Sequence, residues 1–131
     1  MNTVSSQCFP VQSLCQENGC LTVFDESTLP FVVRRVFTVQ ACAGAIRGQH
    51  AHRIGTQALV ALLGAVHVSL TDAAGTSDTV LIPQDQGLIV PPMVWSEQIY
   101  LDPSNLLLVL CDTPFSEADY IRDIDEFRYL T

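Results

Sequence analysis

The chain has 131 residues, of which 48% are hydrophobic, and it carries a net charge of −8. This length suggests one domain with one core, and the apolar runs are too short to span a bilayer. The chain has no lysine, so its positive charge rests on six arginines. We therefore expect a single domain over residues 1–131 that binds neither nucleic acid nor membrane.

The N-terminus and the cysteines indicate the compartment. The first ten residues lack a charged segment followed by a long apolar one, so we expect no secretory signal and a cytoplasmic protein. An odd number of cysteines without C-x-x-C spacing predicts free thiols that mostly pack in the interior, rather than a zinc site or a catalytic cysteine. Cys20 and Cys111 lie in apolar strand patterns and are expected in the core. The five cysteines are Cys8, Cys15, Cys20, Cys42 and Cys111.

Short extended segments fill the first part of the chain. Residues 8–16 alternate weakly, and Asn18-Gly19 is a tight-turn signal before a second strand at 20–24. Residues 31–40 are rich in Val and Phe with a period of two, which predicts a third strand. A loop with two glycines over 41–48 then leads into a strand that contains two histidines.

This histidine strand is the most informative part of the chain. Residues i and i+2 of a strand point to the same face, so His50 and His52 project to one side with their Cα atoms about 7 Å apart. The spacing from Gly44 through these histidines to position 57 and Gly64 resembles the first motif of the cupin barrels, G-x5-H-x-H-x4-E-x6-G. Position 57 is Gln, where a metal-binding cupin has Glu.

The rest of the chain continues in short strands and then changes period. Turns at regular spacing between such strands predict an all-β sandwich or barrel. After Pro114, the segment from Ser116 to Asp119 looks like a capped helix start, and the apolar residues that follow predict a terminal helix. That helix is expected to pack outside the barrel or on a partner subunit. The expected strands are 57–63, 65–71, 78–83, 88–92, 95–101 and 105–112.

Residues 87–96 resemble the second cupin motif, which ends in P-P-G-V-W-H, and Ser96 stands in the histidine position. The four places where a cupin holds its metal are therefore occupied by His50, His52, Gln57 and Ser96. Neutral Gln and Ser are poor ligands for a divalent transition metal, and two histidines without an anionic ligand rarely suffice. We expect no metal and no cofactor, which leaves the histidines for proton transfer.

Four segments in order resemble the sugar-nucleotide 3,4-ketoisomerases, which are small metal-independent cupins that act on dTDP-4-keto-6-deoxyglucose. The segments are FVVRRVF, RGQHAHR, VPPMVWSE and EADYIRDIDEF. The resemblance runs from about Asn18 to the end of the chain. It implies a jelly-roll β-barrel with a C-terminal helix, a homodimer with shared N-terminal strands, and a dTDP-linked 4-keto-6-deoxy sugar as substrate. It also implies a role in making deoxysugars, such as 3-amino sugars of surface polysaccharides.

The implied reaction moves a ketone from C4 to C3 of the hexose through an enediol or enediolate. We assign His50 and His52 as the acid/base pair; the sequence does not order them, and His50 is favoured for the carbon-bound proton. An enediolate oxygen needs a nearby donor or positive charge, which Arg35 would supply from its strand face. The other candidate substrate-binding residues are Arg47 and Arg53 for the diphosphate, with Arg34 in the opposite strand phase, Gln57 for a hydroxyl or an imidazole, Trp95 for stacking, and Ser96.

Several positions depart from the resemblance and keep two alternatives open. Relatives carry Arg where this chain has Asn18, aromatic hydroxyls where it has Phe37 and Thr38, and His where it has Ser96. One alternative is a sugar-nucleotide-binding cupin without catalysis, and the other is a metal-dependent cupin enzyme. The third histidine, His67, is interpreted as structural.

Overall fold

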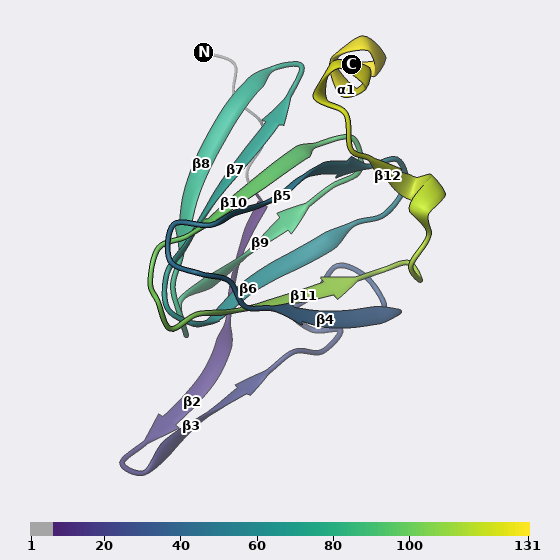
Figure 1. The fold of residues 1–131 in the computed structure, drawn as a ribbon. Coiled ribbons are helices and arrows are strands. Elements are labelled where there is room, and N and C mark those ends of the chain that lie inside the picture. The colour runs from purple at the N-terminus through teal and green to yellow at the C-terminus, as the bar shows by residue number, and fades with distance from the viewer. Residues whose placement is uncertain (1–6) are drawn as a thin grey trace.

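Two five-stranded antiparallel sheets face each other in the computed structural model, which describes residues 7–131 (Figure 1). The first sheet has the order β1-β9-β6-β11-β4, and the second has the order β12-β5-β10-β7-β8. The strands of the first sheet are β1 (Gln7–Pro10), β9 (Gln86–Val90), β6 (Gln57–Leu63), β11 (Leu106–Cys111) and β4 (Arg35–Val39). Those of the second are β12 (Tyr120–Ile121), β5 (Ile46–His52), β10 (Trp95–Tyr100), β7 (Val66–Asp72) and β8 (Gly75–Leu81).

Strand alternation builds the core between the sheets. Val66, Val68 and Leu70 of β7 point inward and are fully buried. They share one apolar cluster with Leu59 and Val109 of the opposite sheet. Each such side chain contributes about 1.5–3 kcal/mol by leaving water, so this cluster stabilises the pairing of the two sheets.

The outer face of the first sheet is also covered, which explains the unbroken apolar run in β6. Residues Gln57 to Ala61 of β6 are all buried. The odd positions face the other sheet, whereas Ala58 and Val60 pack under Phe9 and Leu29 from the N-terminal segment. A strand that is buried on both faces has a continuous run of hydrophobic residues in its sequence.

The prediction of an all-β jelly roll with a C-terminal helix is confirmed. The two sheets form a sandwich, and no strand pairing joins β4 to β5 in the part of the chain that the structure describes. β4 and the histidine strand β5 therefore lie in different sheets. No helix within residues 7–131 has the length and apolar character needed to cross a bilayer.

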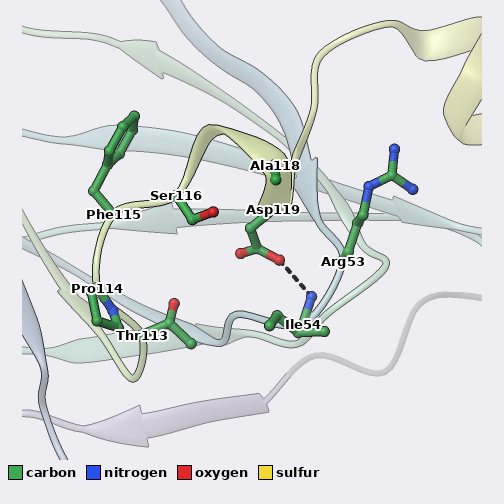
Figure 2. A pocket seen from close by; sticks show the side chains of 8 residues that line it. All are labelled: Arg53, Ile54, Thr113, Pro114, Phe115, Ser116, Ala118 and Asp119. Carbon is green, nitrogen blue, oxygen red and sulfur yellow. Dashed lines mark hydrogen bonds between the residues drawn. The ribbon is translucent and has the colours of Figure 1, made fainter.

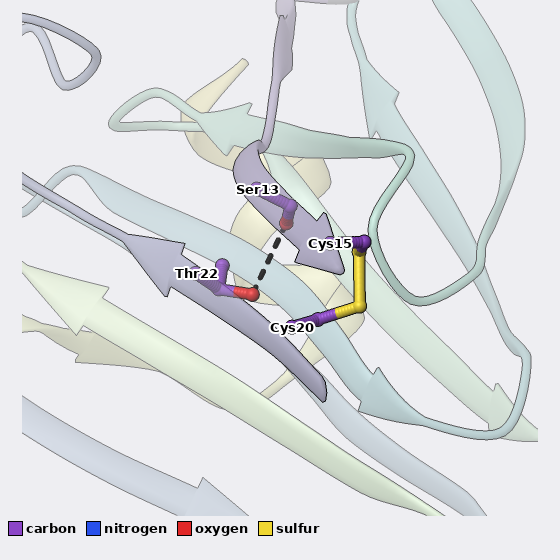
Figure 3. The surroundings of a disulfide bond; sticks show 4 residues. All are labelled: Ser13, Cys15, Cys20 and Thr22. Atoms are coloured by element: carbon purple, nitrogen blue, oxygen red, sulfur yellow. Dashed lines mark hydrogen bonds between the residues drawn. A yellow bond between two sulfur atoms is a disulfide. The ribbon is translucent and has the colours of Figure 1, made fainter. Parts of the chain in front are cut away.

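A two-stranded hairpin, β2 (Gln12–Gln16) and β3 (Gly19–Val23), projects from the sandwich (Figure 1). Its register places Cys15 directly opposite Cys20, and the two form an exposed disulfide (Figure 3). The prediction of free thiols is therefore wrong for this pair, and Cys20 is not in the core. Hairpin register rather than C-x-x-C spacing brings the two sulfurs together. The remaining cysteines are free, with Cys111 buried as expected and Cys8 and Cys42 exposed.

The C-terminal segment also differs from its expected form. The segment predicted to start a helix at Ser116 forms a short 3-10 turn, Glu117–Asp119, followed by β12. Helix α1 begins later and covers Ile124–Leu130, with the Asp123 side chain accepting the N–H of Asp125 as its cap. Pairing of β12 with β5 competes with helix formation here, so tertiary contacts override the local helix signal.

Candidate active site

A bulge in β5 determines which of its side chains point between the sheets. His50 lies opposite Ser96 of β10 and Arg47 lies opposite Gln98, with a register shift between them. Gly48 and Gln49 at this point have positive φ angles of 85° and 51°. The extra residue lets Arg47 and His50 face the same cavity although they are three positions apart.

The His50 imidazole is held as a neutral base. Its Nδ1 lies 2.9 Å from the carbonyl oxygen of Gly48 and donates its proton there, which leaves a lone pair on Nε2. Burial lowers the pKa of His50 to about 4, against the opposite effect of the Gly48 hydrogen bond. At neutral pH this side chain is therefore uncharged and able to accept a proton at Nε2.

His52 is paired with a carboxylate from the C-terminal segment. Its Nδ1 lies 2.9 Å from Oδ2 of Asp119, and both residues are buried. Burial raises the pKa of Asp119, but hydrogen bonds from the Ile54 N–H and from His52 outweigh this and lower it overall. Figure 2 shows the Ile54 N–H pointing at the Asp119 carboxylate, 2.7 Å from Oδ1. The ionised carboxylate fixes His52 with its proton on Nδ1 and stabilises an imidazolium when Nε2 accepts a second proton.

The two imidazoles lie side by side. Their ring centroids are 5.0 Å apart, and the Tyr120 ring lies 5.0 Å from His50 and 4.4 Å from His52. Nε2 of His52 is buried without a hydrogen-bond partner among the described residues. His67 Nδ1 and the Tyr100 hydroxyl share this state, and His52 lies behind His50 rather than in the lining of the cavity described next, so its predicted catalytic role stays a prediction.

A cavity of about 260 Å³ opens between β4 and β5 beside His50. Side chains from both sheets and from the C-terminal segment line it, among them three arginines and no carboxylate. A concave site with convergent guanidinium groups favours an anionic ligand. The lining residues used below are Arg35, Arg47, His50, Gln57, Gln98 and Arg122.

Two of the arginines are fixed by aromatic rings. Arg35 lies 4.6 Å from the centroid of Phe37 and 5.0 Å from that of Phe115, and it donates to the Tyr120 hydroxyl at 3.3 Å. Arg122 lies over the Tyr120 ring at 4.2 Å and forms an ion pair with Glu117 at 2.7 Å. The third, Arg47, forms neither an ion pair nor a cation-π contact with the residues of 7–131, so its guanidinium group is the most available of the three to an anionic ligand.

The other predicted substrate-binding residues divide into two groups. Gln57 lines the cavity, and Ser96 is buried opposite His50, where its hydroxyl accepts a hydrogen bond from Gln98 at 3.2 Å. Arg53 and Trp95 lie outside the cavity lining. Arg53 pairs with Glu126 and borders a separate pocket of about 350 Å³ (Figure 2), whereas the Trp95 ring packs 5.6 Å from Phe127.

Sequence reasoning missed several residues of this site. Asp119, Tyr120 and Arg122 belong to the D-Y-I-R segment, which was interpreted as part of a terminal helix. The family resemblance of this segment could have identified them, because an amphipathic helix does not by itself require these particular residues. Gln98 carried no motif and becomes visible only through strand register.

The donor set at the cupin metal position is unusual. His50 has Ser96 opposite it and Gln57 in the same cavity, both neutral side chains. Within the described residues, no group of three or more His, Cys, Asp or Glu side chains is placed to hold a metal ion. The expectation of a site without metal stays a prediction that chelation tests.

Comparisons with known proteins identify relatives of the whole chain. The family model described as FdtA, WxcM-like, C-terminal, matches residues 5–131. A TDP-4-oxo-6-deoxy-alpha-D-glucose-3,4-oxoisomerase from Aneurinibacillus thermoaerophilus is 32% identical over 119 residues, which cover 89% of this chain and 86% of that protein. Among solved structures, a histidine-to-asparagine variant of the 3,4-ketoisomerase QdtA from Thermoanaerobacterium thermosaccharolyticum, in complex with TDP-4-keto-6-deoxyglucose, has a TM-score of 0.89. It is 26% identical and covers 95% of this chain and 91% of its own. The TDP-fucose-3,4-ketoisomerase WlaRA from Campylobacter jejuni has a TM-score of 0.88 at 25% identity, covering 97% and 96%.

Proposed function

Because the chain belongs to the FdtA (WxcM-like) family, we propose that it is a sugar-nucleotide 3,4-ketoisomerase acting on TDP-4-keto-6-deoxyglucose. The enzyme moves the ketone of the hexose from C4 to C3, as part of deoxysugar synthesis. The observation that carries this proposal is the adjacent pair of imidazoles, His50 and His52, each with its Nδ1 engaged, beside a cavity lined by arginines.

The cavity binds the hexose, and the nucleotide extends outward from it. Ligand pockets are usually about 300–1,000 Å³, so a volume of about 260 Å³ suits one sugar ring rather than a whole nucleotide sugar. Arg47 is exposed at the opening and has no acidic partner among the described residues, which makes it the candidate for the diphosphate.

His50 takes the carbon-bound proton. The C4 ketone acidifies the C3 hydrogen, and Nε2 of His50 removes it, leaving an enediolate whose negative charge rests on O4. Proton transfer from O3 toward O4 exchanges the roles of the two oxygens. Return of a proton to C4 then gives the 3-ketone, so no oxidant or reductant is consumed. The lining of the cavity by His50, and its free Nε2, support this order.

His52 and Arg35 act on the two oxygens, O3 and O4. His52 relays a proton between O3 and O4, with Asp119 stabilising its charged form. Arg35 supplies positive charge for the enediolate and is oriented by its hydrogen bond to the Tyr120 hydroxyl. The Tyr120 ring contacts both imidazoles and would exclude water from them.

The β2–β3 hairpin supports a homodimer with shared N-terminal strands. Leu14 and Leu21 are 66% and 60% exposed on a hairpin that pairs with no other described strand. An isolated two-stranded hairpin is at best marginally stable in water, so a second copy of the chain is the proposed cover.

A cytoplasmic location also remains a prediction. A reducing cytoplasm would keep Cys15 and Cys20 as thiols.

Incubation with TDP-4-keto-6-deoxyglucose, followed by NMR, tests the proposal. Isomerisation predicts a new 3-keto sugar nucleotide that forms at the same rate after treatment with a chelator. Thermal stabilisation by TDP without any product would support the non-catalytic alternative. Loss of activity on chelation, restored by a metal, would support the metal-dependent alternative.

A further inference from the structure

Gln98 is a buried amide in the wall of the cavity that the reaction scheme leaves unused. It is 7% exposed, and alternation along β10 directs it inward together with Ser96 and Tyr100. A glutamine amide offers two N–H donors and one carbonyl acceptor. The structure gives it one hydrogen bond, from Nε2 to the Ser96 hydroxyl at 3.2 Å.

Gln98 contributes to the lining of the cavity. Among the described residues, fully enclosed side-chain atoms without a partner occur only at His52, His67 and Tyr100. The Gln98 carbonyl is therefore not sealed in protein, and Gln98 is part of the cavity lining. A ligand that displaces water from this amide without replacing its hydrogen bonds would bind unfavourably, which favours a polar ligand at this position.

Gly48 places this amide next to His50. A Cβ on Gly48 would lie 3.0 Å from Nε2 of Gln98 and 3.1 Å from the carbonyl oxygen of Ser96. A side chain at position 48 would therefore push the amide away. The Gly48 carbonyl also accepts the Nδ1 proton of His50, so one glycine positions both the amide and the imidazole.

We propose that Gln98, held by Ser96 above Gly48, is a substrate-binding residue that hydrogen-bonds a hydroxyl of the hexose ring. Leu59 and Val109, which line the cavity from the opposite sheet, are apolar, so the Gln98 amide offers hydrogen bonds to a sugar hydroxyl that these residues cannot offer. An uncharged amide adds little to the binding of a diphosphate, which the arginines attract. Gln98 therefore orients the hexose against His50 and contributes to affinity for the sugar but not for the nucleotide. This inference rests on the proposed function for the identity of the ligand.

Binding of TDP and of TDP-glucose separates these contributions, because TDP-glucose carries the hexose hydroxyls but has no ketone to turn over. We expect Gln98→Met to weaken TDP-glucose binding about 10-fold and to change TDP binding less than 2-fold. Gln40→Met is the matched control, since Gln40 is exposed and outside the cavity, and both affinities should stay at the wild-type values. A Gln98→Leu variant repeats the test if the Met variant does not fold, as judged by thermal unfolding.

The result is independent of whether the protein turns substrate over. Selective loss of TDP-glucose affinity in the Gln98 variants supports the inference even if the wild-type protein forms no 3-keto product, in which case only the proposed activity fails. Equal losses for TDP and TDP-glucose, or no loss for either, would overturn the role of Gln98 even if wild-type isomerisation is observed. Wild-type protein that binds TDP-glucose no more tightly than TDP would overturn it as well.

Discussion

Asp119 Oδ2 lies 2.9 Å from Nδ1 of His52, although the two residues are 67 positions apart in the chain. Pairing of β12 with β5 creates this contact by placing Tyr120 opposite His52. Asp119, the last residue of the 3-10 turn, therefore supplies the carboxylate that orients one imidazole, and Tyr120 of the adjoining β12 supplies the ring that contacts both. The C-terminal segment thus lines the candidate site and is more than an outer layer of the sandwich.

Replacing either imidazole tests the acid/base assignment. We expect His50→Asn and His52→Asn each to lower turnover on the order of 10²–10⁴-fold, because each removes a proton-transfer group. TDP affinity should change little, since neither histidine is assigned to the nucleotide. Steady-state kinetics and calorimetry measure the two effects. His67→Asn is the control, because His67 pairs with Asp78 on β7 and β8 away from the cavity, and its turnover should match the wild type.

Asp119→Asn tests the role of the carboxylate behind His52. An amide cannot stabilise the imidazolium as a carboxylate does, so we expect kcat to fall on the order of 10²-fold with KM nearly unchanged. Asp119 acts through His52, so a second measurement is needed. The downfield NMR signal of the His52 Nδ1 proton should weaken or vanish in this variant.

Asp78→Asn provides the matched comparison for Asp119→Asn, because it breaks the other His–Asp pair of the described chain. Its kcat should equal that of the wild type. Equal losses of kcat in both variants would mean that general destabilisation, rather than the His52 contact, explains the Asp119 effect.

Stability should depend on pH through His50. Burial lowers its pKa in the folded protein to about 4, against 6.5 for an unperturbed histidine. Between these values the unfolded chain binds more protons, so the free energy of unfolding is highest above pH 6.5 and falls as pH decreases toward 4. Urea unfolding at pH 7 and pH 4.5 measures this decrease. The His50→Gln variant should lose less stability over that interval, and an unchanged decrease would show that His50 is not its source.

The hairpin should determine the oligomeric state. We expect the wild-type protein to sediment as a dimer. In the double variant Leu14→Asp, Leu21→Asp the dissociation constant of the dimer should rise at least 10-fold, because charges replace apolar contacts. Val80→Asp is the control, because Val80 is similarly apolar and 47% exposed but lies on β8. A monomeric wild type, or a double variant that stays dimeric, would remove the hairpin from the interface.

The sequence predicted those parts of the site that depend on local periodicity. His50 and His52 share a strand, and Arg35 lies on the cavity side of β4 with Phe37, as the period of two required. The β-sandwich followed from the regular spacing of turns. The exposed disulfide did not, because pairing of Cys15 with Cys20 depends on hairpin register and not on a cysteine motif.

Long-range contacts account for what the sequence did not reveal. The segment containing Asp119 and Tyr120 has a helix-like composition, but a buried carboxylate bonded to His52 and Ile54 holds it against β5 instead. The inward position of Arg47 depends on the bulge at Gly48, since strict alternation would turn it away from His50. Neither effect is readable from propensity.

NMR of TDP-4-keto-6-deoxyglucose in D₂O, in the presence of the folded protein, tests the central claim most directly. We expect the C3 proton signal to disappear while the carbonyl resonance moves from C4 to C3, and we expect the His50→Asn protein to produce neither change. A wild-type protein that is saturated with the sugar nucleotide and yet leaves both signals in place would contradict it.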